Sequence, residues 1–279
     1  MAQLILLAMP VFFGVIISNA TNNPANGKIH TFFESIMCIK RLFVIAVSMT
    51  VLSACQSLPQ TPHLERSIHI TSAVHQIHAT LADNQEIDNE LTFAVGEQTQ
   101  THPNLSGYYP ISTGANAFAA RSILTAMSSH SIDVQYYIWH EDEAGQLMLK
   151  DLWDAAERGV MVRILLDDLN GSKALDQLLI RVAKHPNIAI RLANPMAYRN
   201  FRFVNYLANP MRTNIRMHNK SMTFDNHLSI IGGRNIGNEY LNNDKSNQFA
   251  DLDVLLIGEV VPKITSSFDE YWDSLYAYD

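Results

Sequence analysis

The chain has 279 residues, of which 47% are apolar, a composition that suits a globular protein of one large domain or two small ones. Its formal net charge of -7 argues against non-specific binding to nucleic acid, because that binding needs a basic surface. The net negative charge does not argue against a small phosphate-binding pocket.

Two apolar stretches open the chain. Residues 2–18 carry no charge, and a second stretch begins at Met37 with two basic residues followed by an apolar run over 42–54. A basic start, a short apolar run and small residues at its end are the anatomy of a secretory signal. The run is shorter than a membrane-spanning helix requires, so a signal peptide is the favoured interpretation and a spanning helix the alternative.

The last four residues of that stretch, LSAC at 52–55, resemble a bacterial lipobox. The resemblance implies a lipoprotein signal peptide over 37–54, cleavage before Cys55 and lipid on the Cys55 sulfur. Three acyl chains would hold the protein firmly at a membrane. Residues 1–36 are then either an over-called start ahead of Met37 or an extra apolar segment.

The expected location is the cell envelope, as a membrane-anchored lipoprotein. Gln56, rather than an aspartate, follows the lipidation candidate, and this resembles lipoproteins of the Gram-negative outer membrane. The chain's other cysteine, Cys38, lies inside the signal, so no disulfide and no thiolate metal site is expected.

Residues 55–104 are polar and mixed, without a strong hydrophobic period, and we predict a solvated arm that leads from the membrane. His75 and His78 would share one face of a helix, but no third ligand accompanies them. We therefore predict no metal site, and no cofactor of another kind.

From about residue 105 the pattern becomes that of a folded domain that continues to 279. Alternating apolar residues predict strands, and apolar residues three and four apart predict helices. The expected elements are a helix within 107–130, a strand over 131–139, a helix over 146–159, a strand over 160–168, a helix over 172–185 and a strand over 187–194. This alternation favours an α/β fold with a mixed, mostly parallel sheet flanked by helices.

Residues 194–216 break this alternation. They contain four arginines with aromatic residues between them, and Arg191 precedes them. One interpretation is a long surface loop; the other is a loop that lines a cleft for an anionic ligand or lipid head groups. Arg216, at the end of the segment, is a candidate substrate-binding residue.

Two further strands are expected over 216–224 and 228–233, joined by a turn at 225–227, then a strand over 251–258 and a closing helix over 261–278. Side chains alternate along a strand, so His218 and Lys220 should point the same way. An imidazole beside an ammonium group makes a phosphate site, and the lysine favours the neutral, nucleophilic imidazole.

The residues at the end of the second of these strands, and just after it, fit the same chemistry. Gly232 and Gly233 would let a ligand approach the backbone, and Asn235 would add an amide donor beside them.

The string HNKSMTFD, followed after six residues by GGRN, resembles the HKD motif of the phospholipase D superfamily. Together with IDVQYYIW, AAERGVMVRILLDD and GGRNIGNEY, it resembles the bacterial cardiolipin synthase branch, especially its C-type members, over roughly residues 105–279. The resemblance implies a phospholipase D-like half-domain and two-step phosphodiester transfer without a metal. His218 would form a phosphohistidine, and Lys220 and Asn235 would stabilise the phosphoryl oxygens.

A carboxylate should orient and charge the imidazole, by the logic of a catalytic triad. Asp251 is the first candidate and Asp253 the second, and because the two would share a face of a strand, the sequence leaves the choice open. Asp225 completes the motif at the turn, and in the family this position mostly orders the site.

Members of the superfamily carry two such motifs, one histidine acting as nucleophile and the other protonating the leaving oxygen. This sequence contains one. Three interpretations stay open: an N-terminal fragment of a longer protein, inactive alone; a homodimer with His218 of each copy facing the other across a two-fold axis; or a second half on a separate chain.

The predicted function is phosphatidyl transfer or phosphodiester hydrolysis on phospholipids, of the cardiolipin synthase or phospholipase D type. The expected partners are phospholipid, a membrane, and either a second copy or a second motif-bearing half. The alternatives are a homodimeric single-motif nuclease and a half-domain that binds phosphate without turnover. The acidic balance and the lipobox argue against a nucleic acid partner.

Overall fold

The computed structural model describes residues 40, 64–84, 90–199, 202–208, 210–241 and 251–279. The predicted signal peptide, except Lys40, the lipidation candidate Cys55 and the predicted segment 1–36 lie outside these residues. In the part that is described, no helix is both long enough and apolar enough to cross a membrane. The chain divides into units 1–57 and 58–279, and everything below concerns the second.

The described strands of this unit form one eight-stranded sheet in the order β1-β7-β6-β5-β2-β3-β4-β8. They are β1 (Ser106–Ile111), β2 (Ser131–Tyr136), β3 (Met161–Asp167), β4 (Ile188–Ala193), β5 (Ser221–Phe224), β6 (Leu228–Gly232), β7 (Asp253–Gly258) and β8 (Ala277–Tyr278).

The predicted α/β fold class is confirmed, but the prediction of a mostly parallel sheet is wrong. Only β2, β3 and β4 pair in parallel, through the helical crossovers that the sequence predicted. The chain then returns across the sheet so that β5 pairs antiparallel with β2, and β6, β7 and β1 follow antiparallel. Short turns join β5 to β6 and permit this arrangement, so the sheet is mixed and mostly antiparallel.

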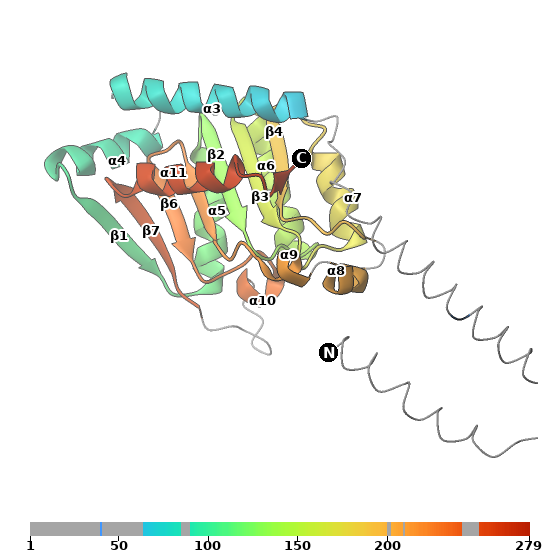
Figure 1. Cartoon of the computed structure of the whole chain (residues 1–279). Helices are drawn as coiled ribbons and strands as arrows, with labels where there is room; N and C mark the ends of the chain where they lie inside the picture. The colour runs from blue at the N-terminus through green and yellow to red at the C-terminus, as the bar shows by residue number, and fades with distance from the viewer. Residues whose placement is uncertain (1–39, 41–63, 85–89, 200–201, 209, 242–250) are drawn as a thin grey trace, which may run out of the picture. The chain divides into compact units, whose positions relative to one another are not determined.

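Helices cover both faces of the sheet (Figure 1). They are α3 (Leu64–Asn84), α4 (Glu90–Thr101), α5 (Gly114–Met127), α6 (Glu143–Glu157), α7 (Lys173–Val182), α8 (Arg202–Ala208), α9 (Pro210–Asn214), α10 (Asn238–Leu241) and α11 (Val261–Trp272).

The face under α5, α6 and α7 is an apolar core. Ile132 and Val134 of β2 are buried there with Met148 and Leu152 of α6. The apolar periods of the sequence predicted these helices, although one leucine of α6, Leu147, is exposed. Burial of such side chains contributes about 1.5–3 kcal/mol each and fixes the helices against the sheet.

The opposite face, under α3 and α11, is held by ion pairs as well as apolar contacts. Arg163 of β3 is fully buried and binds Asp133 through two hydrogen bonds of 2.7 and 2.8 Å, and Asp269 of α11 at 2.8 Å. Two carboxylates compensate this buried guanidinium, which would otherwise be costly. The contacts fix the direction of α11 across the sheet.

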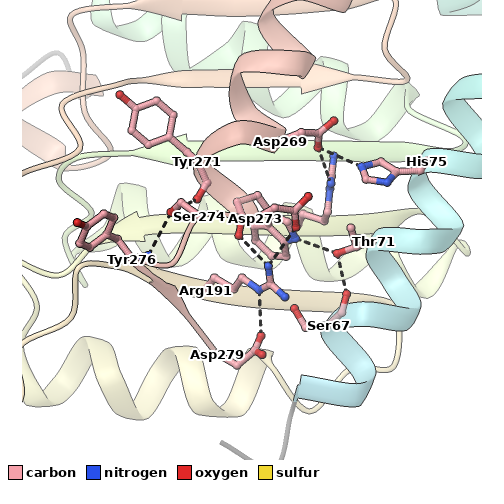
Figure 2. Close-up of polar contacts among 12 residues, drawn as sticks. Ser67, Thr71, His75, Arg191, Asp269, Tyr271, Asp273, Ser274, Tyr276 and Asp279 are labelled. Carbon is pink, nitrogen blue, oxygen red and sulfur yellow. Dashed lines mark hydrogen bonds and ion pairs between the residues drawn. The ribbon is translucent and has the colours of Figure 1, made fainter. Parts of the chain in front are cut away.

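Figure 2 shows the neighbouring contacts at the end of α11. Arg191 of β4 donates to the Trp272 carbonyl at 2.7 Å and lies within 3.5 Å of Asp273 and Asp279. The Trp272 indole in turn donates to the Thr71 hydroxyl of α3 at 2.8 Å. Arg191 therefore braces the chain's last residues against β4.

The structure differs from the predicted solvated arm over residues 55–104. Ile70 and Val74 of α3 are buried against the sheet, in a cluster with Phe268 and Trp272. His75 pairs with Asp269, and His78 bonds the Ser131 hydroxyl at 2.8 Å. The sequence did not predict α3 because its apolar stripe is narrow and lies between polar residues, so its helical period is weak.

The segments that carry the candidate site residues meet at one edge of the sheet, where β2, β3 and β4 end. Because β5 runs antiparallel to β2, β3 and β4, it begins at the edge where those strands end. The end of β6 and the start of β7 meet there too. Helices α8, α9 and α10 lie at this edge (Figure 1), and His218 precedes β5 there.

Candidate active site

His218 and Lys220 lie together at this edge, in an extended segment just before β5. The Lys220 ammonium nitrogen is 3.3 Å from Nδ1 and 3.5 Å from Nε2 of His218, and it donates to the His218 carbonyl at 2.8 Å. The Lys220 carbonyl accepts from Gly232 at 3.3 Å, so pairing with β6 fixes the lysine backbone. The predicted meeting of imidazole and ammonium is present.

The two side chains differ in exposure. His218 is exposed, whereas Lys220 is buried. Burial lowers the pKa of Lys220, because a charged ammonium loses its hydration, and the charge of Asp251 opposes this effect. An anion beside Lys220 would restore the lost interactions, so the pair is suited to bind phosphate.

Tyr137, just beyond the end of β2, packs against this pair. Its ring centroid lies 4.6 Å from that of His218, and the Lys220 nitrogen lies 5.4 Å from the same ring. A cation near an aromatic ring is stabilised by the ring's electrons. Tyr137 thus supports both groups from one side.

A groove of about 540 Å³ opens beside the pair. His218 and Lys220 line one end of it, and Lys263 of α11 adds a second cation. Ile231 and Val254 supply an apolar floor. A phosphodiester with an apolar substituent fits this combination.

Hydrogen bonds with Ile138 and Tyr240 hold the Asn235 side chain. Its side-chain oxygen accepts from the Ile138 backbone at 3.0 Å, and the Tyr240 hydroxyl is hydrogen bonded to the side chains of Asn235 and Glu239. The amide is thereby oriented at the same edge as Lys220. Asp251 connects the two, because its charge raises the pKa of Lys220 and of Tyr240.

The structure separates the two carboxylates between which the sequence could not choose. Asp253 is fully buried and binds Arg121 at 3.0 Å, on the apolar-core side of the sheet. Asp251 is partly exposed and lies close enough to influence Lys220. Within the described residues neither carboxylate is hydrogen bonded to His218, so the orienting role of Asp251 stays a prediction.

Gly232 and Gly233 make room for these carboxylates. A Cβ atom at Gly232 would lie 2.1 Å from an Asp253 oxygen, and one at Gly233 would lie 2.1 Å from an Asp251 oxygen. Any side chain here would displace a carboxylate. The glycines were predicted to admit a ligand, and in the structure the space is taken by aspartates.

The structure does not bring Asp225 to His218. Asp225 lies in the turn at the far end of β5, fully buried, and accepts from the backbone of Ser129, His130 and Ser131 at 3.0, 2.8 and 2.9 Å. It shares positive φ angles with Asn226, as a type I′ hairpin turn requires. Its role is to fix the hairpin against β2.

Arg216, the candidate substrate-binding residue, is tied to protein atoms. It donates to the Thr213 carbonyl at 2.7 Å and to Asp167 at 3.2 Å. Arg199 likewise binds Asp168 at 2.7 Å. These arginines shape the segment between β4 and β5, and a direct role of Arg216 toward substrate stays a prediction.

Tyr137, Tyr240 and Lys263 were missed by the sequence reasoning. Tyr240 belongs to the string GNEY, which the sequence linked only to the family resemblance. Tyr137 was predicted only as part of a strand. The positions of Tyr137 beside His218 and of Tyr240 beside Asn235 depend on strand order, which no local pattern reveals. Lys263 comes from α11, whose direction across the sheet is set by buried ion pairs.

The fold and the site together define an α/β domain with a paired histidine and lysine at one edge of a mixed sheet. A family model described as "Cardiolipin synthase, PLD-like domain" matches residues 123–272. The chain therefore belongs to the phospholipase D superfamily, in its cardiolipin synthase branch.

Curated relatives agree with this assignment in sequence. Cardiolipin synthase C of Escherichia coli (strain K12) is 44% identical over 182 residues, which is 65% of this chain and 38% of that protein. The cardiolipin synthase of Geobacillus thermodenitrificans (strain NG80-2) is 27% identical over 220 residues, 78% of this chain and 38% of its own length. The chain thus spans well under half of these relatives.

Among solved structures, Nuc of Salmonella typhimurium, a phospholipase D family member, matches with a TM-score of 0.46 and 15% identity. The match covers 63% of this chain and 98% of that one.

Proposed function

We propose that this domain transfers a phosphatidyl group between phospholipids, in the manner of a cardiolipin synthase, with hydrolysis of the same phosphodiester when water is the acceptor. The observation that carries the proposal is the Lys220 ammonium 3.3 Å from the His218 ring, at an exposed edge with a groove beside it. Its support is the membership of the cardiolipin synthase branch over residues 123–272.

The chemistry proceeds in two steps. A ring nitrogen of His218 attacks phosphorus, a nitrogen–phosphorus bond forms, and the bond to the leaving alcohol oxygen breaks. Lys220 and the Asn235 amide stabilise the charge that develops on the phosphoryl oxygens. The acceptor alcohol then attacks phosphorus, and the nitrogen–phosphorus bond breaks to free His218.

The leaving oxygen needs a proton, and we propose that a second histidine-bearing half supplies it and recovers a proton from the acceptor alcohol in the second step. That half is either a second copy of this chain or a separate polypeptide. A copy related by a two-fold axis would place two His218 side chains at one phosphorus, so that one acts as nucleophile and the other as acid.

The test is lipid turnover by the full chain in mixed micelles of phosphatidylglycerol labelled in its phosphate. The wild type should release glycerol and form cardiolipin or phosphatidic acid, and it should carry label on histidine after rapid quenching. His218→Ala should remove both, a loss of about 10⁴-fold in rate, since a nucleophile is lost.

His69→Ala is the matched control, because His69 is exposed on α3. It should retain full activity and labelling. Cleavage of plasmid DNA by the wild type, abolished by His218→Ala and without lipid turnover, would instead support a single-motif nuclease. Tight phosphate binding with no product from either substrate would leave a binding domain.

We further propose that Cys55 anchors the chain as a lipoprotein of the cell envelope, which follows from the lipobox-like residues 52–55. Cys55→Ser should abolish incorporation of labelled palmitate and leave the uncleaved precursor. Unchanged incorporation would refute lipidation at Cys55.

A further inference from the structure

The segment between β4 and β5 exposes apolar side chains where a water-soluble surface would be polar. Leu207 is 79% exposed and Phe203 65%, and Tyr206 and Ile215 are exposed as well. We call these four residues the α8–α9 patch. Exposed apolar groups gathered on one segment, rather than scattered singly, are typical of an interaction surface.

Hydrogen bonds hold the patch in place. The Asn205 side chain accepts from the Tyr198 backbone at 3.0 Å, and the Thr213 hydroxyl donates to the Asn205 carbonyl at 3.0 Å. Asn194 donates to the carbonyls of Arg212 and Ile215. These bonds turn Asn205 and Thr213 inward, while Phe203, Tyr206 and Leu207 face outward.

The patch adjoins the catalytic pair. Burial and the charge of Asp167 raise the pKa of Tyr137, and the charge of Tyr206 adds a smaller increase. Tyr137 packs on His218, with ring centroids 4.6 Å apart. Both α8 and α9 lie at the edge of the sheet that holds the site (Figure 1).

The sequence around the patch is basic, although Arg199 is paired with Asp168 and Asp176 and Arg216 with Asp167. Residues 177–224 contain eight lysines and arginines and no aspartate or glutamate, in a chain whose net charge is -7. The α8–α9 patch is therefore apolar, aromatic and free of acidic residues of its own.

We propose that the α8–α9 patch docks on an anionic phospholipid surface and places His218 at the depth of the lipid phosphates. Apolar and aromatic side chains with cations beside them suit the boundary between head groups and acyl chains. A second copy is the poorer occupant, because a two-fold axis through the patch would oppose arginines to arginines. This inference rests on the proposed function, since it assumes a lipid substrate.

The test measures the depth of one residue in a membrane. Leu207→Trp is made in the full chain and mixed with vesicles of phosphatidylglycerol and phosphatidylcholine, with and without bromine on the acyl chains. Tyr108→Trp is the matched control, since Tyr108 is 77% exposed on β1, at the other side of the sheet. The parent chain corrects for its three native tryptophans.

The tryptophan at 207 should shift to shorter wavelength and lose about half of its added emission to bromine, as expected for a side chain buried below the head groups. The tryptophan at 108 should lose none. Vesicles of phosphatidylcholine alone should quench less, because the attraction between arginines and anionic lipid is gone.

The proposal is overturned if bromine quenches neither position, or both equally. It is also overturned if the tryptophan at 207 shifts with protein concentration in the absence of lipid, because a second copy would then cover the patch. The readout needs no turnover, so a quenched but inactive chain refutes only the proposed function. An active chain without quenching refutes only the docking.

Discussion

The two ends of β5 carry parts of one motif and are built in opposite ways. At its start, His218 is exposed, its ring nitrogens lie 3.3 and 3.5 Å from the Lys220 nitrogen, and its ring packs against Tyr137. At its end, Asp225 is fully buried and accepts three backbone hydrogen bonds. The His218 ring can still form hydrogen bonds with a ligand, whereas the Asp225 carboxylate is already bonded to the backbone.

This contrast separates two reasons for a residue to belong to a motif. In the proposed function His218 and Lys220 act on the substrate, whereas Asp225 locks the hairpin that positions them. The short strand β5 separates Lys220 from Asp225, so a turn that is fixed at one end of the strand also fixes the position of Lys220 at the other end. The predictions below test whether stability and activity divide in this way.

The largest expected effect is that of Asp225→Ala on stability. The change would leave three backbone N–H groups without an acceptor and put alanine at a φ of 49°. We expect the free energy of unfolding in urea to fall by about 3–5 kcal/mol, since each lost bond to a buried charge costs about 1.5–3 kcal/mol and the losses overlap.

Asp225→Asn is the comparison variant for this change. Asparagine tolerates positive φ and keeps one acceptor oxygen, so it should restore part of the lost stability. An unchanged unfolding midpoint for Asp225→Ala would show that the turn does not depend on these bonds.

A smaller effect is expected for Tyr240→Phe. The phenyl ring keeps the packing but loses the hydroxyl bonded to Asn235 and Glu239, so the Asn235 amide keeps only its bond from the Ile138 backbone and is less firmly oriented. We expect kcat for lipid turnover to fall about tenfold with little change in KM, as for one misplaced hydrogen-bond donor worth about 1–1.5 kcal/mol. Tyr109→Phe, on exposed β1, is the control and should not alter kcat.

The division between the two ends of β5 was only partly predictable from the sequence. The strands and helices between 131 and 194 follow from strong apolar periods, and His218 and Lys220 follow from alternation along the chain. Both predictions rest on local patterns, and the structure contains the elements and the side-chain pair that these patterns predict.

The parts that the sequence did not predict depend on distant contacts. The return of β5 to the far side of β2 reverses its direction and brings Tyr137 to His218. The packing of α3 depends on an apolar stripe that is visible only once the sheet exists. The choice between Asp251 and Asp253 depends on Arg121, which lies more than a hundred residues earlier.

Asp251→Asn should change the pH dependence of activity. Burial lowers the pKa of Lys220, and the negative charge of Asp251 raises it. Without that charge the pKa of Lys220 falls further, so the lysine loses its proton at lower pH. If the charged lysine stabilises the phosphoryl oxygens, the alkaline limb of the kcat/KM profile should move to lower pH.

The control for this shift is Asp273→Asn, which removes a carboxylate beside Arg191 at the end of α11. It should leave the alkaline limb in place. If Asp251→Asn leaves it in place as well, the charge of Lys220 does not limit the alkaline rate.

The smallest expected effect is that of His218→Ala on stability. The side chain is exposed, and its backbone carbonyl, which accepts from Lys220 at 2.8 Å, is kept in alanine. We expect the free energy of unfolding to change by less than about 0.5 kcal/mol, as for surface substitutions. Activity should nevertheless disappear. A loss of stability near that of Asp225→Ala would mean that His218 also holds the hairpin, and the two ends of β5 would then share one structural role.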